Sequence, residues 1–168
     1  MNFLSAYTRQ GRFILGQRKR LLADLTDEHL ALEPIAGTKT AGWLVGHLSV
    51  TGDFGRRLCG LAPMCPKEWR ALFNPGTFPS LDRSTYPPMA ELRETVANVY
   101  YDFFASAPDA PDDVLALPNP YTPALNAFPT AGDFAAYLMT GHLAHHCGQL
   151  GSWHASAGLR PAGVRVAD

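Results

Sequence analysis

Residues 131–157 read AGDFAAYLMTGHLAHHCGQLGSWHASA, and this stretch has the length and spacing of one long amphipathic helix. Thr130 followed by Asp133 resembles a capping box at its start, with Asp in place of the usual Glu or Gln. Gly158 can supply a left-handed cap at its end, and Pro161 prevents continuation. The stretch therefore predicts a capped helix over residues 131–157 with histidines near its centre.

Two of these histidines have a spacing that suits a metal ion. His142 and His146 are four residues apart, so they project from one helix face about one turn apart. Both imidazoles can then reach one ion about 2 Å from each ring nitrogen. His145 lies on a neighbouring part of the same face. The His-Glu-x-x-His signature of zinc proteases is absent, because Leu143 stands where its glutamate would be.

A further histidine lies within an apolar seam on the helix predicted over residues 40–61. The seam alternates steps of three and four residues: Leu44, His47, Thr51, Phe54, Leu58 and Leu61. Alone, His47 would be read as a hydrogen-bonded core histidine. Three inward histidines, however, would bury many ring nitrogens that need partners, and a shared metal ion satisfies them together. We therefore predict His47, His142 and His146 as metal ligands, with one or more coordination positions open.

The rest of the chain predicts two more long helices and proline-rich links. One helix covers residues 2–25, and another begins near Pro88 and ends before Pro108. The long link 62–88 is predicted to carry a short helix over residues 67–73, and links of this length usually cross a bundle or cover a site. Strand signals are weak. The expected fold is an all-α four-helix bundle with long crossover links, in a single domain over residues 1–168.

Composition restricts the classes of partner. The chain has 168 residues, of which 46% are hydrophobic and 17% are charged, as in a globular protein. The formal net charge is -1, and Arg18, Lys19 and Arg20, which form the basic cluster, are read as a solvated helix face. No nucleic-acid partner is therefore expected. No apolar run approaches about 18 residues, so we expect no membrane partner.

The cysteine usage predicts a reducing compartment. The three cysteines form an odd count without the close pairs of a metal site, whereas secreted disulfide scaffolds favour even, dense cysteines. Residues 1–20 hold no uninterrupted apolar core of signal-peptide length. A cytoplasmic location is expected.

The remaining histidines and aromatic residues are weaker candidates. His29 and His154 are predicted to lie at the surface, and Cys147 is predicted to be a small packing residue. Four aromatic residues could line a pocket, although at helical spacing such residues are more often core: Trp43, Tyr100, Phe103 and Trp153.

Two segments resemble the DinB-like family of bacterial metal-binding bundles. They are WLVGHLSV (residues 43–50) and HLAHHCGQLGSWHASAGLRP (residues 142–161), the second in the family's His-x-x-His-His-x-Gly-Gln-Leu register. The resemblance implies a four-helix bundle, frequently a homodimer. It also implies His47, His142 and His146 as ligands of zinc or nickel, with His145 adjacent but not coordinating. Some relatives are transferases or isomerases that use bacillithiol or mycothiol, and others are described as hydrolases. The chain departs from the family mainly in the link 62–88.

The leading functional hypothesis is a metal-dependent enzyme, a thiol-dependent transferase with a small-molecule substrate. An open three-histidine site can lower the pKa of a thiol cosubstrate, and His145 would be the catalytic proton shuttle. Hydrolysis with metal-activated water is the alternative, but the histidine face of the last helix carries no carboxylate to act as general base. A non-catalytic metal-binding stress-response module is the third hypothesis, because an open metal site alone does not establish catalysis.

Overall fold

Four long helices make up the protein. The computed structural model describes residues 2–159, and the side chains of all of these except 18 and 19. The long helices are α1 (Leu4–Ala23), α2 (Ala41–Leu58), α4 (Met89–Ser106) and a last helix that consists of α6 (Ala131–Tyr137), the π-helical segment η5 (Leu138–His142) and α7 (Leu143–Ser156). Within residues 2–159 the sole β pairing is the isolated bridge between Pro118 and Thr130. The predicted all-α fold is confirmed, and the helix ends differ from the predicted ones by at most three residues.

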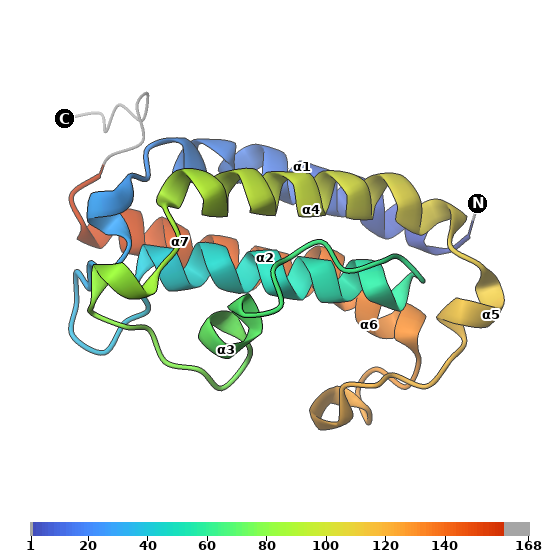
Figure 1. Cartoon of the computed structure of the whole chain (residues 1–168). Coiled ribbons are helices and arrows are strands. Elements are labelled where there is room, and N and C mark those ends of the chain that lie inside the picture. The colour runs from blue at the N-terminus through green and yellow to red at the C-terminus, as the bar shows by residue number, and fades with distance from the viewer. Residues whose placement is uncertain (1, 160–168) are drawn as a thin grey trace.

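The helices pack in two pairs, α2 with α4 and α1 with the last helix (Figure 1). Helices α2 and α4 run in the same direction, and α1 and α7 run in the opposite one. The link between α2 and α4 must therefore return along the bundle, and it carries the short helix α3 (Trp69–Phe73), as predicted, against α2. The link between α4 and α6 joins neighbouring helix ends and contains α5 (Asp112–Leu115). Single 3₁₀ turns complete the links: Asp27–His29, Arg83–Thr85, Ala107–Asp109 and Thr122–Ala124.

Both ends of the last helix are capped by the predicted residues. The backbone N–H of Asp133 donates to Thr130 Oγ1 at 3.1 Å, and Asp133 Oδ2 accepts from the Thr130 N–H at 3.1 Å. Gly158 adopts φ +73°, the left-handed conformation that favours glycine. Pro161 lies outside the described residues. These caps set where the last helix begins and ends, and so where its histidines lie along the bundle.

Helix α2 is buried on almost every side, because glycines let its neighbours approach closely. A Cβ atom at Gly55 would overlap the ring of Phe103 on α4, and a Cβ atom at Gly46 would overlap the ring of Phe73 on α3. Phe73 and Phe103 are both fully buried. The link that follows α2 is thereby packed directly against the helix turn that carries His47.

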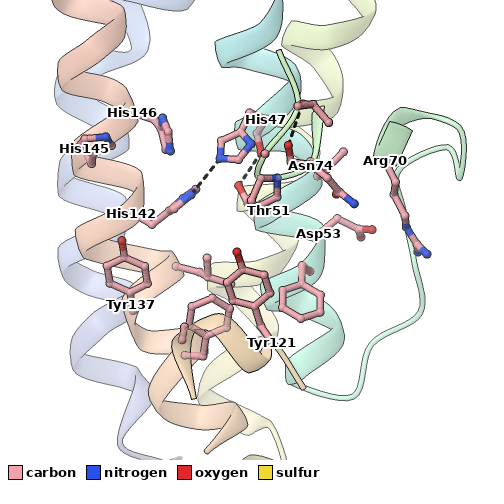
Figure 2. A pocket seen from close by; sticks show the side chains of 18 of the residues that line it. His47, Thr51, Asp53, Arg70, Asn74, Tyr121, Tyr137, His142, His145 and His146 are labelled. Carbon is pink, nitrogen blue, oxygen red and sulfur yellow. Dashed lines mark hydrogen bonds between the residues drawn. The ribbon is translucent and has the colours of Figure 1, made fainter. Parts of the chain in front are cut away.

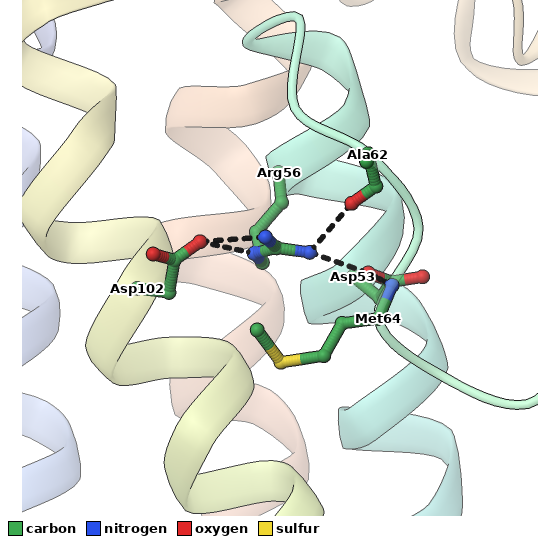
Figure 3. Close-up of polar contacts among 5 residues, drawn as sticks. All are labelled: Asp53, Arg56, Ala62, Met64 and Asp102. Atoms are coloured by element: carbon green, nitrogen blue, oxygen red, sulfur yellow. Dashed lines mark hydrogen bonds and ion pairs between the residues drawn. The ribbon is translucent and has the colours of Figure 1, made fainter.

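A buried ion-pair network fastens the start of this link (Figure 3). Arg56 donates to Asp53 Oδ1 at 2.9 Å, to Asp102 Oδ2 on α4 at 2.6 Å and to the carbonyl oxygen of Ala62 at 2.9 Å. The backbone N–H of Met64 donates to Asp53 Oδ1 at 2.8 Å. Removing Arg56 would leave the buried carboxylate of Asp53 without a counter-charge. The network holds α2, α4 and residues 62–64 together, and it neutralises Asp53.

The basic cluster and the apolar character of the helices are the features on which the expectations about nucleic-acid and membrane partners were based. Arg20 of the predicted basic face is exposed, whereas the side chains of Arg18 and Lys19 lie outside the described ones. Among the described helices, none combines the length and the apolar character that a membrane span requires.

Candidate metal centre

Three histidines from two distant stretches of chain meet in the bundle (Figure 2). His47 comes from α2, His142 from the end of η5 and His146 from the first turn of α7. Their ring centroids are 5.2 Å apart for His47 and His142, 4.5 Å for His47 and His146, and 4.4 Å for His142 and His146. One ring nitrogen from each lies within 4.8 Å of the others. The predicted convergence is therefore present.

The geometry of this cluster fits one divalent ion. The Nε2 atoms of His47 and His142 are 3.2 Å apart. Two nitrogens that each lie about 2.0–2.1 Å from a tetrahedral zinc ion are about 3.3–3.4 Å from one another. Because the side chains are only 4%, 9% and 8% exposed for His47, His142 and His146, their nitrogens need partners other than bulk water.

A carbonyl group from the link orients His47. Its Nδ1–H donates to the carbonyl oxygen of Phe73 at 2.6 Å, which leaves the lone pair on Nε2, the nitrogen that faces His142. The ring also stacks on Trp43, with centroids 4.5 Å apart and planes 10° apart. Helix α3 thus determines which nitrogen of His47 is available for coordination.

The last helix orients its own histidines. His146 Nδ1–H donates to Gln149 Oε1 at 2.7 Å, so its Nε2 is also the nitrogen with a free lone pair. His142 ends the π-helical segment, whose wider turn shifts the register of the helix by part of a turn. Such π turns are frequent at functional sites. The ring of Tyr137, one turn earlier, packs edge-on against His142 at 5.9 Å.

Burial keeps the three imidazoles neutral. It lowers the pKa of His142 to about 2 and that of His146 to about 4, with electrostatic repulsion from the neighbouring histidines as a second cause. Burial also lowers the pKa of His47, and the hydrogen bond to Phe73 offsets part of this effect. Protons therefore compete weakly for the ligand nitrogens near pH 7.

The geometry agrees with the comparison to known families. The family model of the DinB superfamily matches residues 18–150, which is more than half of the chain and includes all three histidines. The chain belongs to the DinB superfamily. No curated protein and no solved structure matches it.

A cavity of about 750 Å³ adjoins the histidine cluster in this DinB-superfamily chain. Its lining comes from α2, the link 62–88, the segment around Tyr121 and the last helix. One side is aromatic: Phe54, Tyr121, Phe128, Phe134 and Tyr137. Figure 2 shows the hydroxyl groups of Tyr121 and Tyr137 pointing toward the histidines. Volumes of this order hold small organic ligands.

His145 lies at this cavity but outside the cluster. Its side chain is exposed, lines the cavity and has its ring centroid 4.9 Å from that of His146.

Among the aromatic residues considered from the sequence, Trp43 lines the cavity. Tyr100, Phe103 and Trp153 are core residues that do not line it.

The prediction that His154 lies at the surface is wrong. Its side chain is 1% exposed, and its Nε2–H donates to the carbonyl oxygen of Leu21 on α1 at 2.6 Å. The reason is that α7 packs against both α1 and α2, so a residue turned away from the histidine cluster is still buried.

His29 is half-buried, and its ring lies 5.6 Å from that of Trp153. Cys147 is buried, as expected of a packing residue.

Several groups at the site were not predicted from the sequence. The Phe73 acceptor is a backbone carbonyl, which every residue carries, so only the fold reveals it. Lys39, Arg57 and Arg70 line the cavity from the link before α2, from α2 and from α3. For Arg70 the predicted helix over residues 67–73 was a partial signal, because it placed the residue on a link expected to cover a site.

Proposed function

We propose that this DinB-superfamily protein is a metal-dependent enzyme that transfers a low-molecular-weight thiol to an electrophilic substrate. His47, His142 and His146 would hold one divalent ion, zinc or nickel. The observation that carries the proposal is the convergence of three buried, neutral imidazoles beside a cavity, with no carboxylate in the set. Three protein ligands leave coordination positions open for a reacting molecule.

The chain's own residues account for binding and proton transfer. A divalent ion in this site would lower the pKa of a coordinated thiol and so supply a nucleophile at neutral pH. Phe73 and Gln149 keep the ligand nitrogens of His47 and His146 directed at the cluster. His145 would accept the proton that the thiol loses and release it to solvent, since its side chain is exposed.

The setting of Asp53 favours thiol transfer over hydrolysis. Asp53 is the one carboxylate among the described residues that line the cavity. It is 3% exposed and already accepts hydrogen bonds from Arg56 and from the backbone of Met64. A carboxylate engaged in this way is a poor general base, because a proton on it would break a buried ion pair. A thiolate needs no such base once it is formed.

The proposal is tested with protein purified without a metal-affinity tag and loaded with zinc or nickel. Bacillithiol and mycothiol are offered with 1-chloro-2,4-dinitrobenzene, and thiol consumption is followed. We expect catalysis that is lost on chelation and in His142→Ala. The matched variant His145→Ala should keep its metal and lose about 10²-fold or more in kcat, which separates proton transfer from metal binding.

Two other results would contradict thiol transfer. Cleavage of an ester or amide that is abolished by chelation, without thiol consumption, would make the protein a hydrolase. Specific ligand binding without turnover in both assays would make it a metal-binding module.

A further inference from the structure

Three cationic side chains line the cavity without a carboxylate partner. Lys39 precedes α2, Arg57 lies near the end of α2, and Arg70 lies on α3. In the part of the chain that the structure describes, none of them forms an ion pair. Lys39 Nζ lies 4.0 Å from the Trp43 ring centroid, and the guanidinium of Arg57 lies 5.4 Å from that of Phe54. Lys39 and Arg57 therefore lie over aromatic rings, which do not cancel their charge.

The cavity therefore carries an excess of positive charge. Asp53 is the one described acidic group in its lining, and its charge is paired with Arg56, which lies outside the lining. Like charges around a partly enclosed space repel one another, and an anion placed among them relieves that repulsion. A divalent ion on three neutral imidazoles would keep its full charge and add to the excess.

Arg57 and Arg70 lie toward the other end of the cavity from the histidines, whereas Lys39 lies at the histidine end, over the Trp43 ring that stacks on His47. His47 and Arg57 are ten residues apart on one continuous helix, which corresponds to about 15 Å along its axis. Arg70 lies beyond Asp53 as seen from the histidines (Figure 2). Tyr121 and the other rings of the aromatic wall line the same cavity. A ligand that reaches both ends is long, apolar in the middle and charged at one tip.

We propose that the cavity binds an elongated organic acid, with its reactive group at the three histidines and a terminal carboxylate at Arg57 and Arg70. Guanidinium groups suit this role because they can donate two parallel hydrogen bonds to a carboxylate. The inference rests on the proposed function for the reactive end only. The carboxylate end depends on residues that are present whether or not a metal ion is bound.

The test compares two probes that differ at one tip, 8-mercaptooctanoate and the neutral 8-mercapto-1-octanol. Dissociation constants are measured by calorimetry with metal-loaded protein and with chelator-treated protein. We expect the carboxylate to bind at least about tenfold more tightly in both forms, because charge-assisted hydrogen bonds are stronger than neutral ones. Arg57→Gln and Arg70→Gln should each remove most of this preference. Arg57→Lys should retain part of it, and Arg9→Gln, an exposed control on α1, should leave it unchanged.

Equal affinity for the two probes in the wild type, or a preference that survives both glutamine variants, would overturn this inference. Either result alongside three-histidine metal binding and turnover would leave the proposed function standing. Conversely, a preference that depends on Arg57 and Arg70 in a protein that binds no metal would support the acid-binding cavity while contradicting the metal-dependent function.

Discussion

His146 and His154 are both buried on α7, two turns apart, yet their surroundings differ completely. His146 is 8% exposed and lies beside two other imidazoles at the edge of a cavity. His154 is 1% exposed and faces the backbone of α1, where it donates one hydrogen bond to Leu21. Burial of a histidine is thus no sign of a metal site by itself. What distinguishes the cavity end of α7 is that ring nitrogens from separate elements converge there.

The largest expected difference between the two histidines is in stabilisation by metal. Zinc or nickel at about 1,000 times its dissociation constant should raise the free energy of unfolding by about 4 kcal/mol, because the ion binds the folded chain. His146→Ala should abolish this gain. His154→Ala should keep it, although the unpaired Leu21 carbonyl should lower the stability of the metal-free protein by about 1–3 kcal/mol. Urea unfolding with and without metal measures both effects, and loss of the gain in His154→Ala would break the comparison.

A pair of glycine substitutions extends the comparison to the α2 side of the cluster. The alanine Cβ in Gly46→Ala would overlap the buried Phe73 ring and should cost about 1–3 kcal/mol. It should also weaken metal binding, because the Phe73 carbonyl that orients His47 must move. Gly148→Ala on α7 meets no atom within 4 Å and should stabilise the protein by about 0.5–1 kcal/mol. Metal affinity and thermal unfolding of the two variants are the readouts, and unchanged metal affinity in Gly46→Ala would argue against the role of Phe73.

Gln149→Leu should weaken metal binding by about 10–100-fold, because His146 loses the acceptor that fixes its tautomer. Competition titration with a chromophoric chelator measures this change. Gln149→Glu retains an acceptor and should recover much of the affinity. If the leucine variant bound metal like the wild type, the orientation of His146 would have to come from packing alone.

The last comparison concerns how stability depends on pH without metal. The pKa of His146 is lowered to about 4 in the folded protein, whereas an unfolded histidine titrates near 6.5. Between these values the unfolded chain binds more protons, so stability falls as the pH drops from about 6.5 toward 4. His146→Ala should reduce this slope by up to about 1.4 kcal/mol per pH unit. Unfolding curves at several pH values, recorded in chelator, measure this slope for the wild type and for His146→Ala. Equal slopes in the two proteins would contradict a lowered pKa of His146.

The sequence predicted the parts of the fold that depend on local pattern. Periodic apolar residues and caps such as Thr130 with Asp133 indicate helices whatever their neighbours are. The meeting of His47 with His142 and His146 was also predictable, because three histidines on inward faces need shared partners. The family motif assigned the same residues.

The features that the sequence did not reveal depend on tertiary contacts. His154 is buried because α7 has a second neighbour, α1, and periodicity around one face does not report it. The π turn before His142 has no simple residue signature. The cavity cations Arg57 and Arg70 come from elements whose relative positions depend on how the link 62–88 folds back over α2.

The most direct test of the metal centre is elemental analysis of protein purified without a metal-affinity tag. We predict one zinc or nickel ion per wild-type chain, and also per chain of His145→Ala and His154→Ala. We predict almost none in His47→Ala, His142→Ala or His146→Ala, provided that circular dichroism shows each to be folded. A full equivalent of metal in any of these last three variants, or no metal binding by the wild type, would contradict a site built from these three imidazoles.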